Sequence, residues 1–171
     1  MKTLTLLLLA FLLASCSGTG KPTQTETSNS LKVDEKKDSK NSPGAKCDPT
    51  LWQHVYDAAR LEVISECKLV TGIIEELDHN EDGDTHMLLR LDPGQEDLLK
   101  KKNISKKDGD LVIEVVCANP IKEKKVGAVC DGYSSGVRIP AVGEHVKVTG
   151  SFVLDSHNGW TEIHPVTSID N

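Results

Sequence analysis

An apolar run near the N-terminus, LTLLLLAFLL at residues 4–13, limits how much of this 171-residue chain can enter a folded domain. The run follows Lys2 and has signal-peptide length, whereas a membrane-spanning helix needs about 20 apolar residues. Residues 17–46 lack aromatic side chains and are rich in Ser, Thr, Lys, Asn and Gly. Such a segment buries too little apolar surface to offset its ordering entropy. We therefore expect a signal peptide at 1–15, a disordered tether at 16–46 and one folded domain at 47–171, which can bury one modest core.

The charge of that domain argues against nucleic acid as a partner. The whole chain carries −6, of which Lys2 contributes +1 and residues 17–46 contribute +2, so residues 47–171 carry −9. Binding to a phosphate backbone requires clustered positive charge that releases counterions. With two Trp, two Tyr and two Phe, the chain also lacks an aromatic platform for single-stranded bases.

The leader ends in Leu13-Ala14-Ser15-Cys16, which resembles the bacterial lipobox. In that family the cysteine thiol takes a diacylglyceryl group, the chain is cut before the cysteine, and the new amine is usually acylated. The resemblance implies that Cys16 anchors the protein in a lipid bilayer, since several acyl chains bind durably. Ser17 at the next position favours the outer membrane in organisms that have one. The expected location is therefore the extracytoplasmic cell envelope; an ordinary signal peptide with a nearby cysteine is the alternative.

Four further cysteines, Cys47, Cys67, Cys117 and Cys130, suggest two disulfides, because an even number in an exported chain is typical of an oxidising compartment. Three pairings are possible. We favour Cys47–Cys67 and Cys117–Cys130, since each pair brackets one local segment. A four-cysteine zinc site is the alternative, but the spacings contain no C-x-x-C pair.

The hydrophobic pattern predicts a mainly β domain after a short N-terminal helix. Asp48 and Pro49 suit a helix start, and helical spacing continues to Leu61. A second short helix is expected at 97–102. Five strand-like stretches follow the first helix, with Gly150 a natural bulge in the fourth. They cover residues 68–77, 85–91, 110–117, 144–155 and 160–169. Five strands fit an OB-like Greek-key barrel, with an open antiparallel sandwich as the alternative.

Three stretches carry a family resemblance: EDGDTHMLLRLD (81–92), GDLVIEVVC (109–117) and VKVTGSFVLDSHNGWTEIHPV (146–166). They resemble a group of exported bacterial lipoproteins with an OB-like barrel. Members share a DGD-x-H turn and strand, a V-x-VTG-x-x-VLD strand and a GW-x-EIHP ending. The resemblance implies the fold and brings no established activity with it.

The acidic stretch from Asp78 to Asp84 suggests a calcium loop. Asp78, Asn80 and Asp82 match positions one, three and five of an EF-hand, and a glycine follows at six. Position twelve is Leu89 instead of Glu, and strand-like segments flank the loop, so an EF-hand is excluded. A half-loop site completed by a distant carboxylate remains, with a plain acidic turn as the alternative.

A second metal hypothesis joins Asp84 and His86 with Glu162 and His164. The members of each pair share one strand face, and His with carboxylate suits Zn²⁺. The alternative is that both histidines bond backbone groups in the wall of the barrel. The DGDT stretch also resembles the micrococcal nuclease family, where Asp84 would match a metal-binding Asp, but no Glu base or arginine pair accompanies it.

We therefore expect a non-catalytic binding or envelope-structural module of unknown ligand. The alternatives are a metal-dependent hydrolase of nuclease-like type and a calcium-dependent adhesion or scaffold domain. Ca²⁺ or Zn²⁺ is the cofactor that the acidic and histidine patterns would take. Trp160 is expected to pack across a barrel end, with ligand stacking as the sharper alternative.

Overall fold

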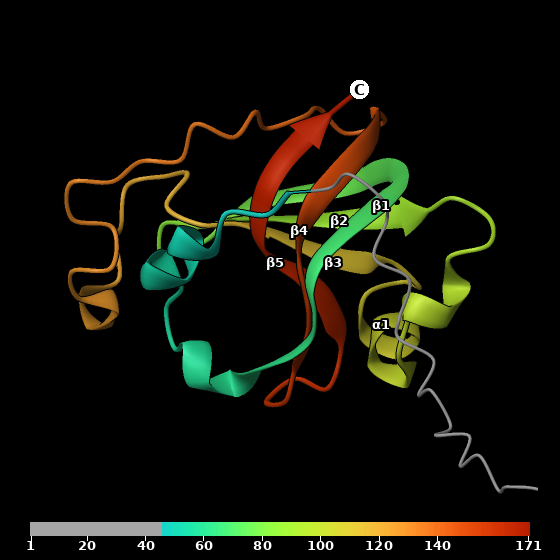
Figure 1. The fold of residues 1–171 in the computed structure, drawn as a ribbon, viewed down its shortest axis with the longest axis horizontal. Helices are drawn as coiled ribbons and strands as arrows, with labels where there is room; N and C mark the ends of the chain where they lie inside the picture. The colour runs from blue at the N-terminus through green and yellow to red at the C-terminus, as the bar shows by residue number, and fades with distance from the viewer. Residues whose placement is uncertain (1–45) are drawn as a thin grey trace, which may run out of the picture. The chain divides into compact units, whose positions relative to one another are not determined.

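Five β-strands close into one ring in the computed structural model, which describes residues 46–171. The strand order is β1-β2-β3-β5-β4, and β4 returns to β1 (Figure 1). β3 and β5 are parallel and the other neighbours are antiparallel. The strands are β1 (Leu61–His79), β2 (Thr85–Leu91), β3 (Leu111–Val115), β4 (His145–Asp155) and β5 (Thr161–Asp170). The domain is therefore mainly β, as predicted, whereas the expected signal peptide, Cys16 anchor and tether lie outside the described residues, apart from Lys46.

Strand β1 connects the two halves of the ring. Its Leu61–Ile73 part pairs with β4, and its Gly72–His79 part pairs with β2. At the crossover a Cβ on Gly72 would clash with the carbonyl oxygen of Arg90, so the glycine permits the close approach of β2. Because β1 serves both neighbours, it begins seven residues before the predicted strand at 68–77.

The helices are short. Two 3-10 helices, η1 (Pro49–His54) and η2 (Ala58–Arg60), replace the single N-terminal helix expected to reach Leu61, because Asp57 adopts a left-handed φ of 50° between them. Asp48 caps η1 through the Thr50 N–H, as its position predicts. η3 (Glu96–Leu98) and α1 (Lys101–Lys106) occupy the region of the second expected helix, and η4 (Lys124–Val126) lies between β3 and β4.

Two apolar clusters lie on opposite faces of the strands. The core cluster fills the ring with alternate strand residues, among them Leu111, Ile113 and Ile163. The second cluster packs η1 and the start of β1 against Val116 and Val153. Strand β3 is buried along its whole length, on both faces.

Both disulfides join the predicted partners. Cys47–Cys67 ties the segment before η1 to β1, and Cys117–Cys130 closes the loop that contains η4. Two disulfides are typical of an oxidising, extracytoplasmic environment. Among the helices of residues 46–171, none has the length and apolarity needed to cross a bilayer.

Gly150 is predicted to be required by packing. It marks a register irregularity between β4 and β5, and a Cβ there would lie 2.5 Å from both the Ile163 side chain and the Pro165 carbonyl oxygen. We expect Gly150→Ala to lower the free energy of unfolding by about 1–3 kcal/mol, because backbone must move. At the exposed Gly136 an added Cβ would meet no atom within 4 Å, so Gly136→Ala is the control. Equal urea midpoints for the two variants would contradict the prediction.

Candidate functional site

A group of buried polar side chains lies on the outer face of β2, β3 and β5. On β3 the residues beside Glu114 in sequence, Ile113 and Val115, point into the core, so Glu114 points outward. Glu162 and His164 alternate with the core residue Ile163 in the same way. Asp84 directly precedes β2. The three strands thus bring residues 84, 114, 162 and 164 to one face.

Glu114 and His164 form the closest charged contact in this group. His164 Nδ1 lies 2.9 Å from Glu114 Oε2 and donates a hydrogen bond to Glu162 Oε1 at 3.1 Å. Glu114 Oε1 lies 3.1 Å from Nε2 of His86, the residue opposite it on β2. Asp84 accepts the Cys117 N–H at 2.8 Å. The group therefore spans β2, β3 and β5.

Arg60 of η2 reaches the same group from the second apolar cluster. Its Nη1 donates to Asp155 Oδ2 at 3.2 Å, and its Nη2 lies 3.8 Å from Glu114 Oε2. Asp155 in turn accepts bonds from the backbone N–H groups of His157 and Asn158. Arg60 thereby connects the buried acids to the β4–β5 turn.

Burial and mutual charge shift the ionisation of the group. Burial would lower the pKa of His164, but the Glu114 and Glu162 carboxylates outweigh it and raise that pKa to about 10. Burial would raise the pKa of Glu114, yet His164 and His86 hold it well below its usual value. Burial raises the pKa of Asp84 to about 7, although the hydrogen bond from the Cys117 N–H acts to lower it. Burial and the neighbouring Glu114 raise the pKa of Glu162. At neutral pH Glu114 and His164 therefore form a buried ion pair.

Asp84, Glu114 and His164 could hold a metal ion. One donor atom from each lies within 4.8 Å of the others, and the three side chains are 3%, 2% and 1% exposed. Three buried side-chain atoms here make no hydrogen bond, although their residues form ion pairs: His86 Nε2, Glu114 Oε2 and His164 Nε2. Carboxylate oxygen and imidazole nitrogen are ligands of divalent transition metals.

The structure divides the residues of the predicted metal sites. Asp84 and His164 belong to the three-residue group. The other two lie at the edge of that group, where His86 contacts Glu114, and Glu162 contacts His164. Sequence reasoning missed Glu114. Its signal was a single charge in the apolar run LVIEVV, on a strand that is buried on both faces.

Two side chains of the acidic turn bond backbone groups of the same turn. Asp82 Oδ1 accepts the Asp84 N–H, as in an Asx turn, and Asp78 Oδ1 accepts the N–H of the next residue, His79. Asp84 itself turns inward to the buried group. Asp78 and Asn80 line a pocket, and the half-loop calcium site stays a prediction.

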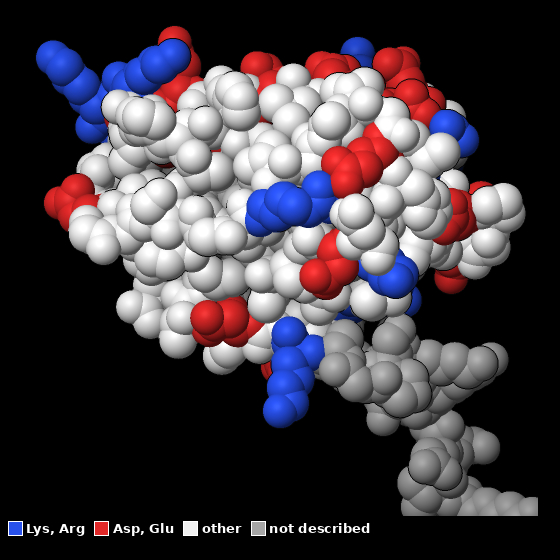
Figure 2. All heavy atoms as spheres, turned by 90° about the horizontal axis from the view of Figure 1, so that it is seen from above, with Lys and Arg blue, Asp and Glu red and all other residues white. Residues whose placement is uncertain are grey.

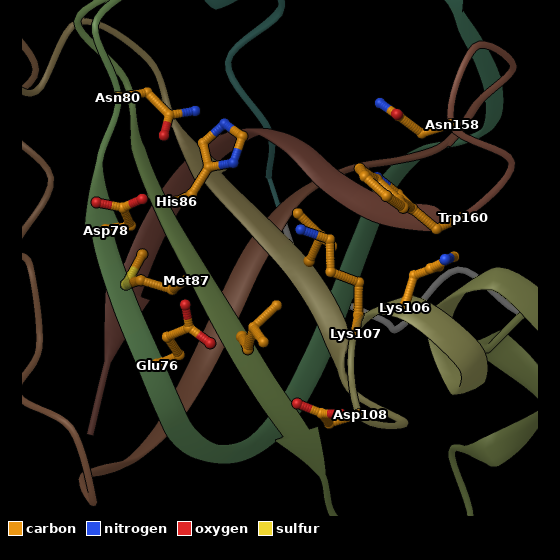
Figure 3. Close-up of a pocket in the computed structure, with 12 residues that line it drawn as sticks. Glu76, Asp78, Asn80, His86, Met87, Lys106, Lys107, Asp108, Asn158 and Trp160 are labelled. Atoms are coloured by element: carbon orange, nitrogen blue, oxygen red, sulfur yellow. The ribbon is translucent and has the colours of Figure 1, made fainter.

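A pocket of about 460 Å³ lies beside the buried group, on the outer face of β2 and β3. Figure 3 shows Glu76 and Asp78 along one wall and Trp160 with Lys106 and Lys107 along the other, with His86 between them. Residues from five regions of the fold line it: Glu76, Asp78, Asn80, His86, Met87, Leu88, Lys106, Lys107, Asp108, Val112, Asn158 and Trp160.

Two pocket residues are anchored to the buried acids. Trp160 Nε1 donates to Glu162 Oε2 at 2.9 Å, and His86 makes the ion-pair contact with Glu114 described above. The Lys107 ammonium lies 4.4 Å from the centre of the Trp160 ring, a cation–π contact. The buried group therefore fixes the floor and one wall of the pocket.

Asn103 of α1 positions the wall that carries Trp160. Its side chain is fully buried and bonds the carbonyl oxygens of Asp110 and Thr161 at 3.0 and 2.9 Å. It also accepts the backbone N–H groups of Lys100 and Thr161. One amide thus joins α1, the start of β3 and the start of β5.

The molecular surface carries both signs of charge. On the face drawn in Figure 2, Lys and Arg are interspersed with Asp and Glu, without a continuous basic patch. This distribution agrees with the net charge of −9 and gives a phosphate backbone no concentrated site on that face.

Asn103→Ala is predicted to lower the free energy of unfolding by at least about 2 kcal/mol, because it leaves several buried backbone groups without partners. Ile104, the next residue of α1, is 63% exposed, so Ile104→Ala is the control and is expected to change stability by less than about 0.5 kcal/mol. Chemical denaturation measures both variants. A loss for Asn103→Ala no larger than that of the control would contradict the assigned role.

Comparison with known proteins found no matching family model, no matching curated protein and no matching solved structure. The resemblance to exported lipoproteins with an OB-like barrel therefore stays a prediction from the three sequence stretches.

Proposed function

We propose that this chain is a lipid-anchored, extracytoplasmic binding module with an OB-like Greek-key barrel, and that it acts without catalysis. The observation that carries the proposal is the pocket on the outer face of β2 and β3. The expected lipid on Cys16 would hold the module at a membrane, and the two disulfides support an extracytoplasmic location.

The strand arrangement supports the OB-like assignment. Five strands close through β1, which pairs with both β2 and β4, and the ring includes the parallel β3–β5 pair. OB folds bind ligands on the face of strands 2 and 3, between the β1–β2 and β4–β5 loops. The pocket occupies this position, since Asn80 follows β1 and Asn158 lies between β4 and β5.

The lining of the pocket favours a small hydroxyl-rich ligand with an apolar face, and we propose a saccharide unit. Trp160 offers a ring for stacking, while Asn80, Asn158 and Asp78 offer hydrogen-bonding groups of both kinds. Acidic and basic walls oppose each other, so neither a strongly anionic nor a strongly cationic ligand is favoured as a whole.

The position of the buried acids supports binding over catalysis. Glu114, Glu162 and Asp84 have the perturbed pKa values typical of proton transfer. None of them lines the pocket; His86 and Trp160 stand between the pocket and Glu114 and Glu162. These acids therefore support the pocket from behind.

Titration of the purified chain with short neutral and amino-sugar oligosaccharides tests the proposal by calorimetry. We expect saturable binding that weakens about tenfold or more in Trp160→Ala, because the stacking surface is lost. The matched control is Trp52→Ala: Trp52 packs against the second apolar cluster and does not line the pocket. Absence of binding, or equal loss in both folded variants, would contradict the proposal.

A further inference from the structure

The Asp84, Glu114 and His164 group has the spacing that a single metal ion requires. Donors bound to one zinc-sized ion at about 2.1 Å lie roughly 3–4 Å apart. One donor atom from each of the three residues lies within 4.8 Å of the others. Small side-chain adjustments would let the three donors meet one ion, with a water in the fourth position.

Unsatisfied buried atoms point to a ligand at this place. His164 Nε2 is buried and makes no hydrogen bond, whereas the other ring nitrogen of His164, Nδ1, faces the Glu114 and Glu162 carboxylates. A buried polar atom without a partner costs about 1–3 kcal/mol, and native proteins contain few of them. A cation bound at His164 Nε2 would remove this cost.

The local balance of charge favours a cation as well. Four buried acids, Asp84, Glu114, Glu162 and Asp155, lie within this linked group. Arg60, which is permanently charged, forms ion pairs with two of these acids, Glu114 and Asp155. A divalent ion would neutralise acids that Arg60 alone does not balance.

We propose that Asp84, Glu114 and His164 bind a divalent transition-metal ion of the zinc type, which acts as a structural ion. Mixed oxygen and nitrogen donors suit Zn²⁺, whereas Ca²⁺ takes six to eight oxygens. The donors come from the turn before β2, from β3 and from β5, which are far apart in sequence. One ion would therefore cross-link three strands. The near-complete burial of the donors keeps a substrate away from the fourth position of the ion.

The proposed ion lies behind the pocket and is independent of the proposed saccharide binding. Saccharide titration can fail while the metal binds, and the metal can be absent while saccharide binds. The pocket residues His86 and Trp160 contact the buried acids, so the two sites meet only through those contacts.

Metal analysis of the full-length chain tests the proposal. The chain is stripped with a chelator, incubated with Zn²⁺, passed over a sizing column and analysed for metal and melting temperature. We expect about one Zn²⁺ per chain and a rise in Tm of roughly 5 °C or more, since an ion that binds only the folded state stabilises it. X-ray absorption is expected to show oxygen and nitrogen neighbours, including one imidazole, at about 2.0–2.2 Å.

Paired variants locate the ion. Asp84→Asn is expected to abolish retention and the Tm rise, each measured against the same variant without metal. Asp82→Asn, in the acidic turn, is expected to keep both. His145→Ala is a second control, because His145 lies 3.0 Å from Asp92 at the surface and could capture zinc there.

Three results would overturn the proposal. One is that wild-type chain retains no Zn²⁺ and shows no Tm rise; another is that Ca²⁺ alone stabilises it. The third is that His145→Ala loses the ion while Asp84→Asn keeps it. If Asp84→Asn fails to fold, the absorption spectrum of the wild-type chain decides, because a first shell without imidazole excludes His164.

Discussion

The contact between Glu114 and His164 stabilises the seam between β3 and β5, which is the weakest strand pairing of the ring. β3 and β5 share only two registered pairs, Val112–Glu162 and Ile113–Ile163, whereas β1 and β4 are paired over most of their length. Parallel pairing is also slightly less stable per residue than antiparallel pairing. The buried charges cross this seam immediately beyond its ladder, and loss of one partner would leave a buried charge unpaired.

The pocket depends on the same seam. His86 is fixed by Glu114 of β3, and Trp160 by Glu162 of β5, so opposite sides of the seam hold the floor and wall of the pocket. Asn103 and Asp155 hold the neighbouring segments by bonding backbone groups of β5 and of the β4–β5 turn. Ligand recognition at this face would thus rest on groups that no ligand touches. Such support from behind is typical of a preorganised site.

Much of the fold was predictable because strands and cysteines leave local signals. Alternating and β-branched runs located all five strands, and the predicted bounds of the second strand equal those of β2. Pairing cysteines that enclose one short segment gave both disulfides. The start of β1 was missed because residues 61–67 pair with β4 about 90 positions later, and helical spacing hid that partner. The ring order itself depends on such distant pairings.

The candidate site was only partly predictable for a similar reason. The sequence pattern singled out four possible metal ligands: Asp84, His86, Glu162 and His164. Residues two positions apart on a strand point to the same face, so each of the two Asp/His and Glu/His pairs was expected to share one. Glu114 sits in an apolar strand and lacks a motif, so its role follows only from the β2–β3 and β3–β5 registers. Arg60 and Asn103 reach their partners through loops and short helices, where no periodicity applies.

Amide hydrogen exchange of Glu114→Gln compared with the wild-type chain tests the central role of the seam most directly. We predict lost protection in residues 111–115 and 161–164, together with the pocket residues His86 and Trp160. Protection should persist where β1 pairs with β4, because that ladder is long and antiparallel. Unchanged protection across β3 and β5, in a variant that folds, would contradict this role of the Glu114–His164 contact.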